Sequence, residues 1–154
     1  MWLILACTIG VALCLLILWI VRARSQREMD RYSVSPEELH SLQSSGQLVL
    51  VFDVRQPLDL LAYPEIIPGA KRIPPSEVLE KPALIPSDQD AVVYCTCPSD
   101  KTSRRILRSA LALGFRRIKF LRGGLAGWKA KGYPVEPYTD NFRLYPATVS
   151  TPIL

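Results

Sequence analysis

Two thiols stand close together where an apolar stretch of the chain gives way to a polar loop. Cys95 directly follows the apolar run 91–94, Cys97 comes two residues later, and a helical pattern begins at about residue 103. The amino terminus of a helix presents unpaired N–H groups and a partial positive charge, which lower the pKa of a nearby thiol from about 8.5. We therefore expect Cys95 or Cys97 to be the catalytic nucleophile, in its thiolate form.

The segment between these thiols and the helix is the expected binding loop for an anionic substrate. Lys101 and Arg104 would lower the thiol pKa and attract anions. Arg105 and Arg108, further along the helix, are interpreted as solvated side chains. The predicted substrate-binding loop consists of Thr96, Pro98, Ser99, Asp100, Lys101, Thr102, Ser103 and Arg104.

Strands and helices alternate along the part of the chain that must position this loop. A continuous apolar run over 48–53 predicts a strand covered on both faces, and Ser35 followed by a proline predicts a helix over 36–44. The alternation predicts an α/β fold with a parallel sheet and helices on both faces. The other expected elements are an edge strand at 71–73, a short helix capped by Ser76, a strand ending at Cys95, a helix over 103–113, a strand over 117–121 and a final helix from 123 through Trp128.

The carboxyl ends of parallel strands meet at one edge of a sheet, and ligands bind there. Asp53, Cys95 and Arg122 follow three of the predicted strands, so we expect them to gather at this edge. Asp53 and Arg55 are interpreted as a supporting structural pair that holds the loop in place.

The amino-terminal segment is the most apolar part of the chain. Residues 2–21 contain no charged side chain, and a helix of about this length crosses a bilayer. Arg22 and Arg24 follow at once, so the sequence predicts a transmembrane helix in the inner (plasma) membrane, with its amino terminus outside and the domain in the cytoplasm. Small residues at Ala6 and Gly10 would allow a homodimer through this helix. The predicted parts of the chain are a transmembrane helix at 1–21, a basic linker at 22–34, a folded domain at 35–136 and a proline-containing tail at 137–154.

The composition disfavours several other classes of protein. Four cysteines are too few for a disulfide scaffold, and two thiols in one loop with one distant histidine cannot complete a zinc site. The net charge of +5 alone does not indicate nucleic-acid binding, because the basic residues are not interleaved with aromatic ones and the sequence contains no nucleic-acid-binding motif. We therefore expect no metal, no cofactor and no nucleic-acid partner.

Five segments stand out when they are taken together and in order: 50–55 (LVFDVR), 67–70 (IPGA), 92–95 (VVYC), 121–128 (LRGGLAGW) and 131–135 (KGYPV). In this order they resemble a single rhodanese-like domain, the fold of the sulfurtransferases, over roughly residues 35–136. The resemblance implies a cysteine that accepts a sulfane sulfur as a persulfide and passes it to a thiol or another nucleophile. The implied partners are a small anionic sulfur donor or a persulfidated protein.

The loop departs from the family pattern, which leaves alternatives open. The family usually has a glycine and then an arginine soon after the cysteine, whereas Pro98 and Lys101 stand here. Strand continuity favours Cys95 as the nucleophile, and the length of the loop up to Gly114 favours Cys97. One alternative is a Cys-x-Cys thiol redox protein, and another is a non-catalytic rhodanese-like binding module. A phosphatase is disfavoured, because the arginine that would clamp an oxyanion is missing at the required spacing.

Overall fold

The computed structural model describes residues 2–96 and 100–139 of the chain. Of the predicted loop, Cys97, Pro98 and Ser99 lie outside the described residues. The chain divides into two compact units, residues 1–32 and residues 33–154.

The first unit is a single helix, α1 (Trp2–Asp30). It continues to Asp30 through most of the segment predicted to be a linker, because arginine, glutamine, glutamate and methionine all have high helix propensity. Within the described residues, no helix has the length and apolar character required to cross a bilayer. The transmembrane helix predicted over residues 2–21 is therefore not supported, and the predicted location of the chain stays a prediction.

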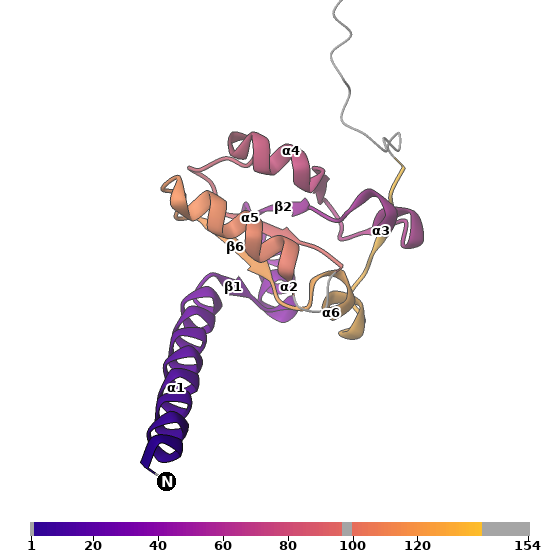
Figure 1. Cartoon of the computed structure of the whole chain (residues 1–154). Helices are drawn as coiled ribbons and strands as arrows, with labels where there is room; N and C mark the ends of the chain where they lie inside the picture. The colour runs from indigo at the N-terminus through magenta and orange to yellow at the C-terminus, as the bar shows by residue number, and fades with distance from the viewer. Residues whose placement is uncertain (1, 97–99, 140–154) are drawn as a thin grey trace, which may run out of the picture. The chain divides into compact units, whose positions relative to one another are not determined.

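The second unit is built on a parallel sheet with the strand order β1-β6-β5-β2-β4 (Figure 1). Strand β5 lies at its centre, paired with β2 on one side and β6 on the other. A separate antiparallel pair joins β3 to β7. The strands are β1 (Ser33–Val34), β2 (Leu50–Asp53), β3 (Glu65–Ile66), β4 (Lys71–Arg72), β5 (Ala91–Tyr94), β6 (Ile118–Leu121) and β7 (Glu136–Pro137).

Helices cover both faces of this sheet, as the sequence predicts. Helices α2 and α6 lie on one face and α4 and α5 on the other (Figure 1). Leu39 of α2 and Trp128 of α6 pack with Val92 and Tyr94 of β5 in the main core, while alternation along the strand turns Val93 to the α5 face. The predicted α/β fold is confirmed. The helices are α2 (Pro36–Ser44), α3 (Pro57–Ala62), α4 (Pro75–Glu80), the short 3₁₀ helix η1 (Pro82–Leu84), α5 (Lys101–Ala112) and α6 (Gly124–Ala130).

Local chemistry explains where the predicted bounds hold and where they fail. Helix α2 has the predicted limits, and the side chain of its N-cap Ser35 accepts a hydrogen bond from the N–H of Glu38 at 3.1 Å. Helix α4 begins at Pro75 with Pro74 as its N-cap, so the predicted capping role of Ser76 is wrong. A proline at the first helical position has a preset φ angle and no N–H that requires a partner.

Candidate active site

Cys95 lies at the carboxyl end of the central strand, where the sequence places it. It directly follows β5, and its exposed fraction is only 1%. Strand β2 ends alongside it, because Asp53 is the register partner of Tyr94. The thiol is thus held at the edge of the sheet where strand ends converge, and α5 begins a few residues further along the chain.

The glycine turn that opens α6 packs against the backbone of Cys95. The backbone N–H of Leu125 donates a hydrogen bond to the carbonyl oxygen of Cys95 at 3.2 Å. Gly124, at φ +53°, approaches the same carbonyl so closely that a Cβ atom there would collide with the oxygen. Only glycine fits this position, for reasons of both backbone conformation and space. The start of α6 therefore fixes the backbone at the thiol.

Asp100 ties the far end of the loop to the same turn. Its backbone is left-handed, with φ 51°, and its side chain is buried with an exposed fraction of 5%. One carboxylate oxygen, Oδ2, accepts a hydrogen bond from the N–H of Gly123 at 3.1 Å. Burial raises the pKa of Asp100, while the Gly123 N–H and the charge of Arg104 act in the opposite direction. Both ends of the loop are thus attached to the Gly123–Gly124 turn.

Several buried polar atoms around the loop have no hydrogen-bond partner among the described residues. They are Thr96 Oγ1, Asp100 Oδ1 and Ser103 Oγ. A buried polar group without a partner costs about 1–3 kcal/mol, so native proteins contain few of them. Two of the three are hydroxyl groups, which can donate to an anion. These atoms lie on both sides of one short loop, so an anion bound there would find hydrogen-bond donors that the described residues leave unused.

Asp53 and Arg55 form a fully buried ion pair behind the strand end. Arg55 Nη2 lies 2.5 Å from Asp53 Oδ2, and Arg55 Nε donates to both carboxylate oxygens. Arg55 also donates to the carbonyl oxygens of Tyr63 and Glu65, which fixes the segment after α3. The Tyr94 hydroxyl donates to Asp53 Oδ2 at 3.2 Å, and burial raises the pKa of this phenol. The network ties β2, β5 and the segment before β3 together beneath the loop.

The other predicted loop residues occupy several environments. The guanidinium of Arg104 lies 4.6 Å from the centre of the Phe120 ring, on the inner side of α5. Lys101 is exposed and Thr102 is partly buried, and both line a groove beside the loop. The roles assigned to the loop residues from the sequence stay predictions. Sequence reasoning treated Gly123 and Gly124 only as a helix start, although the paired glycines signalled a close backbone approach.

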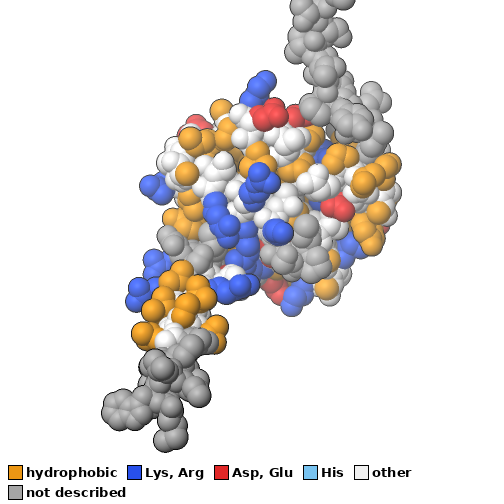
Figure 2. All heavy atoms as spheres, viewed as in Figure 1, with side chains coloured by type: hydrophobic (Ala, Val, Ile, Leu, Met, Phe, Trp, Pro, Cys, Tyr) orange, Lys and Arg blue, Asp and Glu red, His pale blue; other side chains and the backbone are white. Residues whose placement is uncertain are grey.

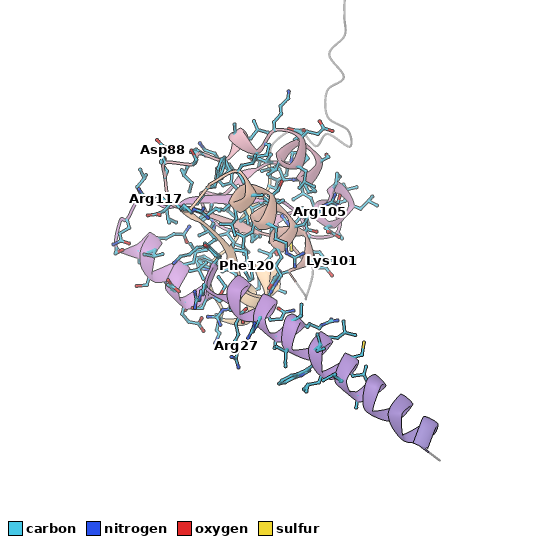
Figure 3. The ribbon with its side chains drawn as sticks, turned by 60° about the vertical axis from the view of Figure 1, so that its left-hand side comes forward. Arg27, Asp88, Lys101, Arg105, Arg117 and Phe120 are labelled. Carbon is cyan, nitrogen blue, oxygen red and sulfur yellow. The ribbon has the colours of Figure 1, made fainter. Side chains whose placement is uncertain are left out.

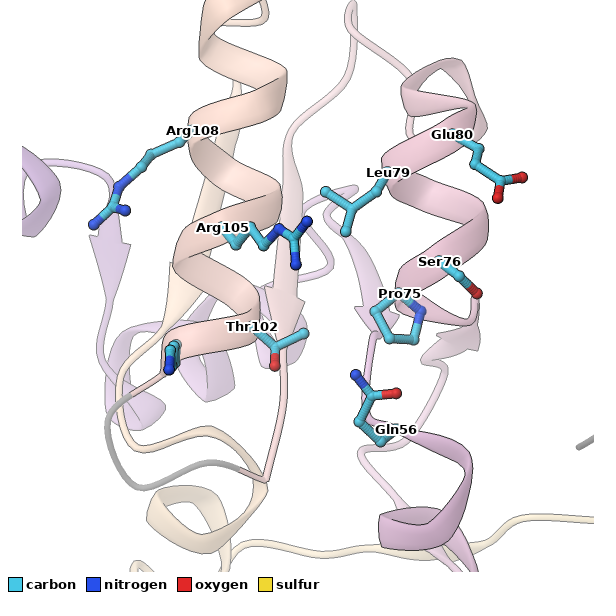
Figure 4. Close-up of a pocket in the computed structure, with 9 residues that line it drawn as sticks. Gln56, Pro75, Ser76, Leu79, Glu80, Thr102, Arg105 and Arg108 are labelled. Carbon is cyan, nitrogen blue, oxygen red and sulfur yellow. The ribbon is translucent and has the colours of Figure 1, made fainter. Parts of the chain in front are cut away.

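The groove runs between α4 and α5 and has a volume of about 570 Å³. Figure 4 shows Arg105 of α5 and Leu79 of α4 pointing toward one another across it, with Thr102 and Pro75 facing the same gap. It reaches the first residue of α5 and so adjoins the end of the Cys95 loop. The lining residues are Gln56, Pro75, Ser76, Leu79, Glu80, Lys101, Thr102, Arg105 and Arg108.

Comparison with known proteins identifies relatives of this arrangement. A sulfurtransferase of Allochromatium vinosum is 28% identical over 102 residues, which is 66% of this chain and 92% of the relative. The crystal structure of a rhodanese-related protein from Thermoplasma volcanium superposes with a TM-score of 0.53 and 26% identity, over 68% of this chain and 96% of that one. A thiosulfate sulfurtransferase from Pseudomonas aeruginosa, at 23% identity and a TM-score of 0.60, shares the fold over 75% of this chain and 21% of its own.

The match to a family model agrees with these similarities. The rhodanese-like domain model matches residues 35–131, which contain every described element from α2 to α6. The chain therefore belongs to the rhodanese-like domain family, and this family and the sulfurtransferase relative of Allochromatium vinosum support its assignment as a sulfurtransferase.

Proposed function

We propose that the loop thiol of this protein carries a sulfane sulfur as a cysteine persulfide and passes it to a thiol or another nucleophile. The observation that carries the proposal is the position of Cys95 at the end of β5. Cys95 directly follows Tyr94, the register partner of Asp53, and directly precedes the loop that leads into α5. The family relationship supports the same chemistry. The donor is a small anionic sulfur compound or a persulfidated protein.

The reaction consists of two displacements at sulfur. The loop thiolate attacks the sulfane sulfur of the donor, a new S–S bond forms, and the donor's remaining part leaves with the electron pair of the broken bond. With thiosulfate the leaving group is sulfite. In the second step an acceptor thiolate or cyanide attacks the outer sulfur of the persulfide and restores the cysteine thiolate.

The surroundings of the loop suit an anionic sulfur species. Ser103 Oγ and Thr96 Oγ1 are buried hydroxyl groups that have no partner among the described residues, and each can donate one hydrogen bond. Donors that are already oriented in a buried site stabilise negative charge more than donors in water do. We infer that these hydroxyls hold the persulfide or its leaving group, with the amino terminus of α5 adding its partial positive charge.

Intact-mass measurement and peptide mapping of the reduced full-length protein test the proposal after exposure to thiosulfate or glutathione persulfide. One added sulfur atom on the peptide that contains Cys95 and Cys97 is expected. Cys95→Ser and Cys97→Ser variants identify the acceptor, and Cys14→Ser, which changes an exposed cysteine of α1, is the control. Loss of two hydrogens would instead favour the thiol redox alternative, and no change with any donor would favour a binding module.

A further inference from the structure

The groove between α4 and α5 adjoins the sulfur-carrying loop but does not include Cys95. Lys101, at its end, directly follows the loop tether Asp100. The groove therefore ends next to the described end of the loop. This inference rests on the proposed function, because it concerns which sulfur donor reaches the thiol.

The α5 side of the groove is cationic. Lys101, Arg105 and Arg108 all line it, and in the described part of the chain none of them forms an ion pair. Figure 2 shows Lys and Arg side chains gathered over α5 on this face of the unit. The acidic lining residue, Glu80, points away from α5, so it does not neutralise these charges (Figure 4).

The cations are spread along the helix and do not converge on one point. Lys101, Arg105 and Arg108 have the i, i+4, i+7 spacing of one helical stripe, which covers roughly 10 Å at about 1.5 Å per residue. Arg105 points toward α4, and Arg108 points away from it (Figure 4). Lys101 and Arg105 both line the groove and stand about one helical turn apart, so they can pair with two separate negative groups of one ligand.

The size and the opposite wall of the groove favour an organic ligand. Its volume of about 570 Å³ lies within the range of roughly 300–1,000 Å³ that is typical of small-molecule sites. Thiosulfate is far smaller and would leave most of this space filled with water. Pro75 and Leu79 present apolar surface directly across from Arg105 (Figure 4). A ligand that has an aliphatic part and more than one carboxylate satisfies both walls.

We propose that this groove binds the organic part of the sulfur donor, which is a low-molecular-weight peptide persulfide with carboxylate groups. Lys101 and Arg105 pair with its carboxylates, and Pro75 and Leu79 contact its aliphatic part. Its S–SH group reaches the loop. There the cysteine thiolate attacks the outer sulfur of the donor and forms a new S–S bond to it. The outer sulfur keeps its hydrogen, and the donor's own S–S bond breaks. The products are a cysteine persulfide and a peptide thiolate, so atoms and charge balance.

Two measurements on the full-length protein test the groove, with Arg105→Gln as the variant. The first is the rate of sulfur loading from glutathione persulfide and from thiosulfate, followed by quenched intact mass. The second is the binding of S-methylglutathione, which cannot transfer sulfur, by calorimetry. Arg116→Gln removes the same charge from an exposed arginine outside the groove lining and is the control. Arg116 precedes Arg117, which lies on the opposite side of the unit from Lys101 (Figure 3).

We expect Arg105→Gln to slow loading from glutathione persulfide at least about tenfold more than loading from thiosulfate, and to weaken S-methylglutathione binding by a similar factor, because a charge-assisted hydrogen bond is lost. Arg116→Gln should change neither quantity. The inference is wrong if S-methylglutathione does not bind the wild-type protein, if both variants behave alike, or if Arg105→Gln affects both donors equally.

The two proposals fail in different ways. If thiosulfate loads sulfur but S-methylglutathione does not bind, sulfur transfer stands and the peptide site is rejected. If S-methylglutathione binds through Arg105 but no donor loads sulfur, the groove is a peptide-thiol site and the sulfur-transfer proposal is rejected.

Discussion

The carboxylate of Asp100 accepts a hydrogen bond from the backbone N–H of Gly123 at 3.1 Å, which joins the end of the cysteine loop to the turn that opens α6. The neighbouring Gly124 packs against the carbonyl oxygen of Cys95 at the other end of the loop. One turn therefore holds both ends of the loop. The conformation around the thiol depends on α6 as much as on β5 and α5.

Asp100→Asn tests the electrostatic part of this arrangement. Burial raises the folded-state pKa of Asp100 above its ordinary value of 3.8. At pH values between these two pKa values, the folded state therefore retains a proton that the unfolded state has released. The free energy of unfolding then falls as pH rises from about 3.8 through the folded-state pKa. Asparagine keeps an acceptor for Gly123 but cannot ionise, so its stability should fall less over this window.

Chemical denaturation of both proteins at a series of pH values from 3.5 to 7.5 measures this difference. The other ionisable groups are common to both proteins and cancel in the comparison. Parallel stability curves for the wild type and the variant would contradict a raised pKa for Asp100.

Gly124→Ala should be among the most destabilising changes to a small residue. The added methyl group meets the Cys95 carbonyl, and the residue must also keep φ +53°. We expect a loss of roughly 2–4 kcal/mol, from about 1 kcal/mol or more of backbone strain and a further cost of about 1–3 kcal/mol for displacing the loop. Gly46→Ala is the matched control, because Gly46 has φ +73° but open space where a Cβ would be added. Equal losses in thermal or urea unfolding would show that the contact with Cys95 has no effect.

Arg55→Met should destabilise the fold strongly, because it leaves the buried Asp53 carboxylate without its charge partner. Removing one member of a buried ion pair costs about 3–5 kcal/mol. Arg117→Met is the comparison, since Arg117 and Asp90 form an ion pair whose side chains are each 54% exposed, and such pairs contribute about 0–1 kcal/mol. Urea denaturation measures both. A loss below about 1 kcal/mol for Arg55→Met would mean that water or another group replaces the guanidinium.

Ser103→Ala separates a role in the site from a role in the fold. Ser103 is fully buried, and its hydroxyl has no hydrogen-bond partner among the described residues. Removing an unsatisfied buried hydroxyl should leave the free energy of unfolding unchanged or raise it by about 1 kcal/mol. If the hydroxyl stabilises the sulfur anion, the rate of sulfur loading should still fall, by roughly tenfold or more. Lower stability with an unchanged loading rate would assign Ser103 a structural role only.

Cys95→Ser should abolish sulfur loading and leave the fold intact, because serine is close to cysteine in size at this buried position. Far-ultraviolet circular dichroism checks the fold, and intact mass checks the loading. Full loading in this variant, with none in Cys97→Ser, would transfer the nucleophilic role to Cys97.

The sequence was most informative where structure depends on local chemistry. Ser35 and the following proline define the start of α2, and a continuous apolar run identifies β2 as a strand covered on both faces. The apolar run before Cys95 likewise predicts β5. These signals come from the preferences of neighbouring residues and from burial on both faces of a sheet, so they can be read without knowledge of the fold.

Short elements were missed because long-range pairing creates them. Strand β1 exists because Ser33 and Val34 pair with Phe120 and Leu121, and β7 exists because it pairs with β3. Neither strand is long enough to produce an alternating pattern. Helix α3 (Pro57–Ala62) was also missed, since six residues give less than two turns of periodicity.

By itself, the sequence determined the α/β order of elements, the place of Cys95 at the end of a strand and the family of the domain, because each leaves a pattern in consecutive residues. Only the tertiary structure decided that Asp100 binds Gly123, that Gly124 closes on Cys95 and that Arg105 faces Leu79 across a groove. The partners in these contacts come from different strands and helices. Their distances depend on how the sheet packs its helices, and no local preference encodes them.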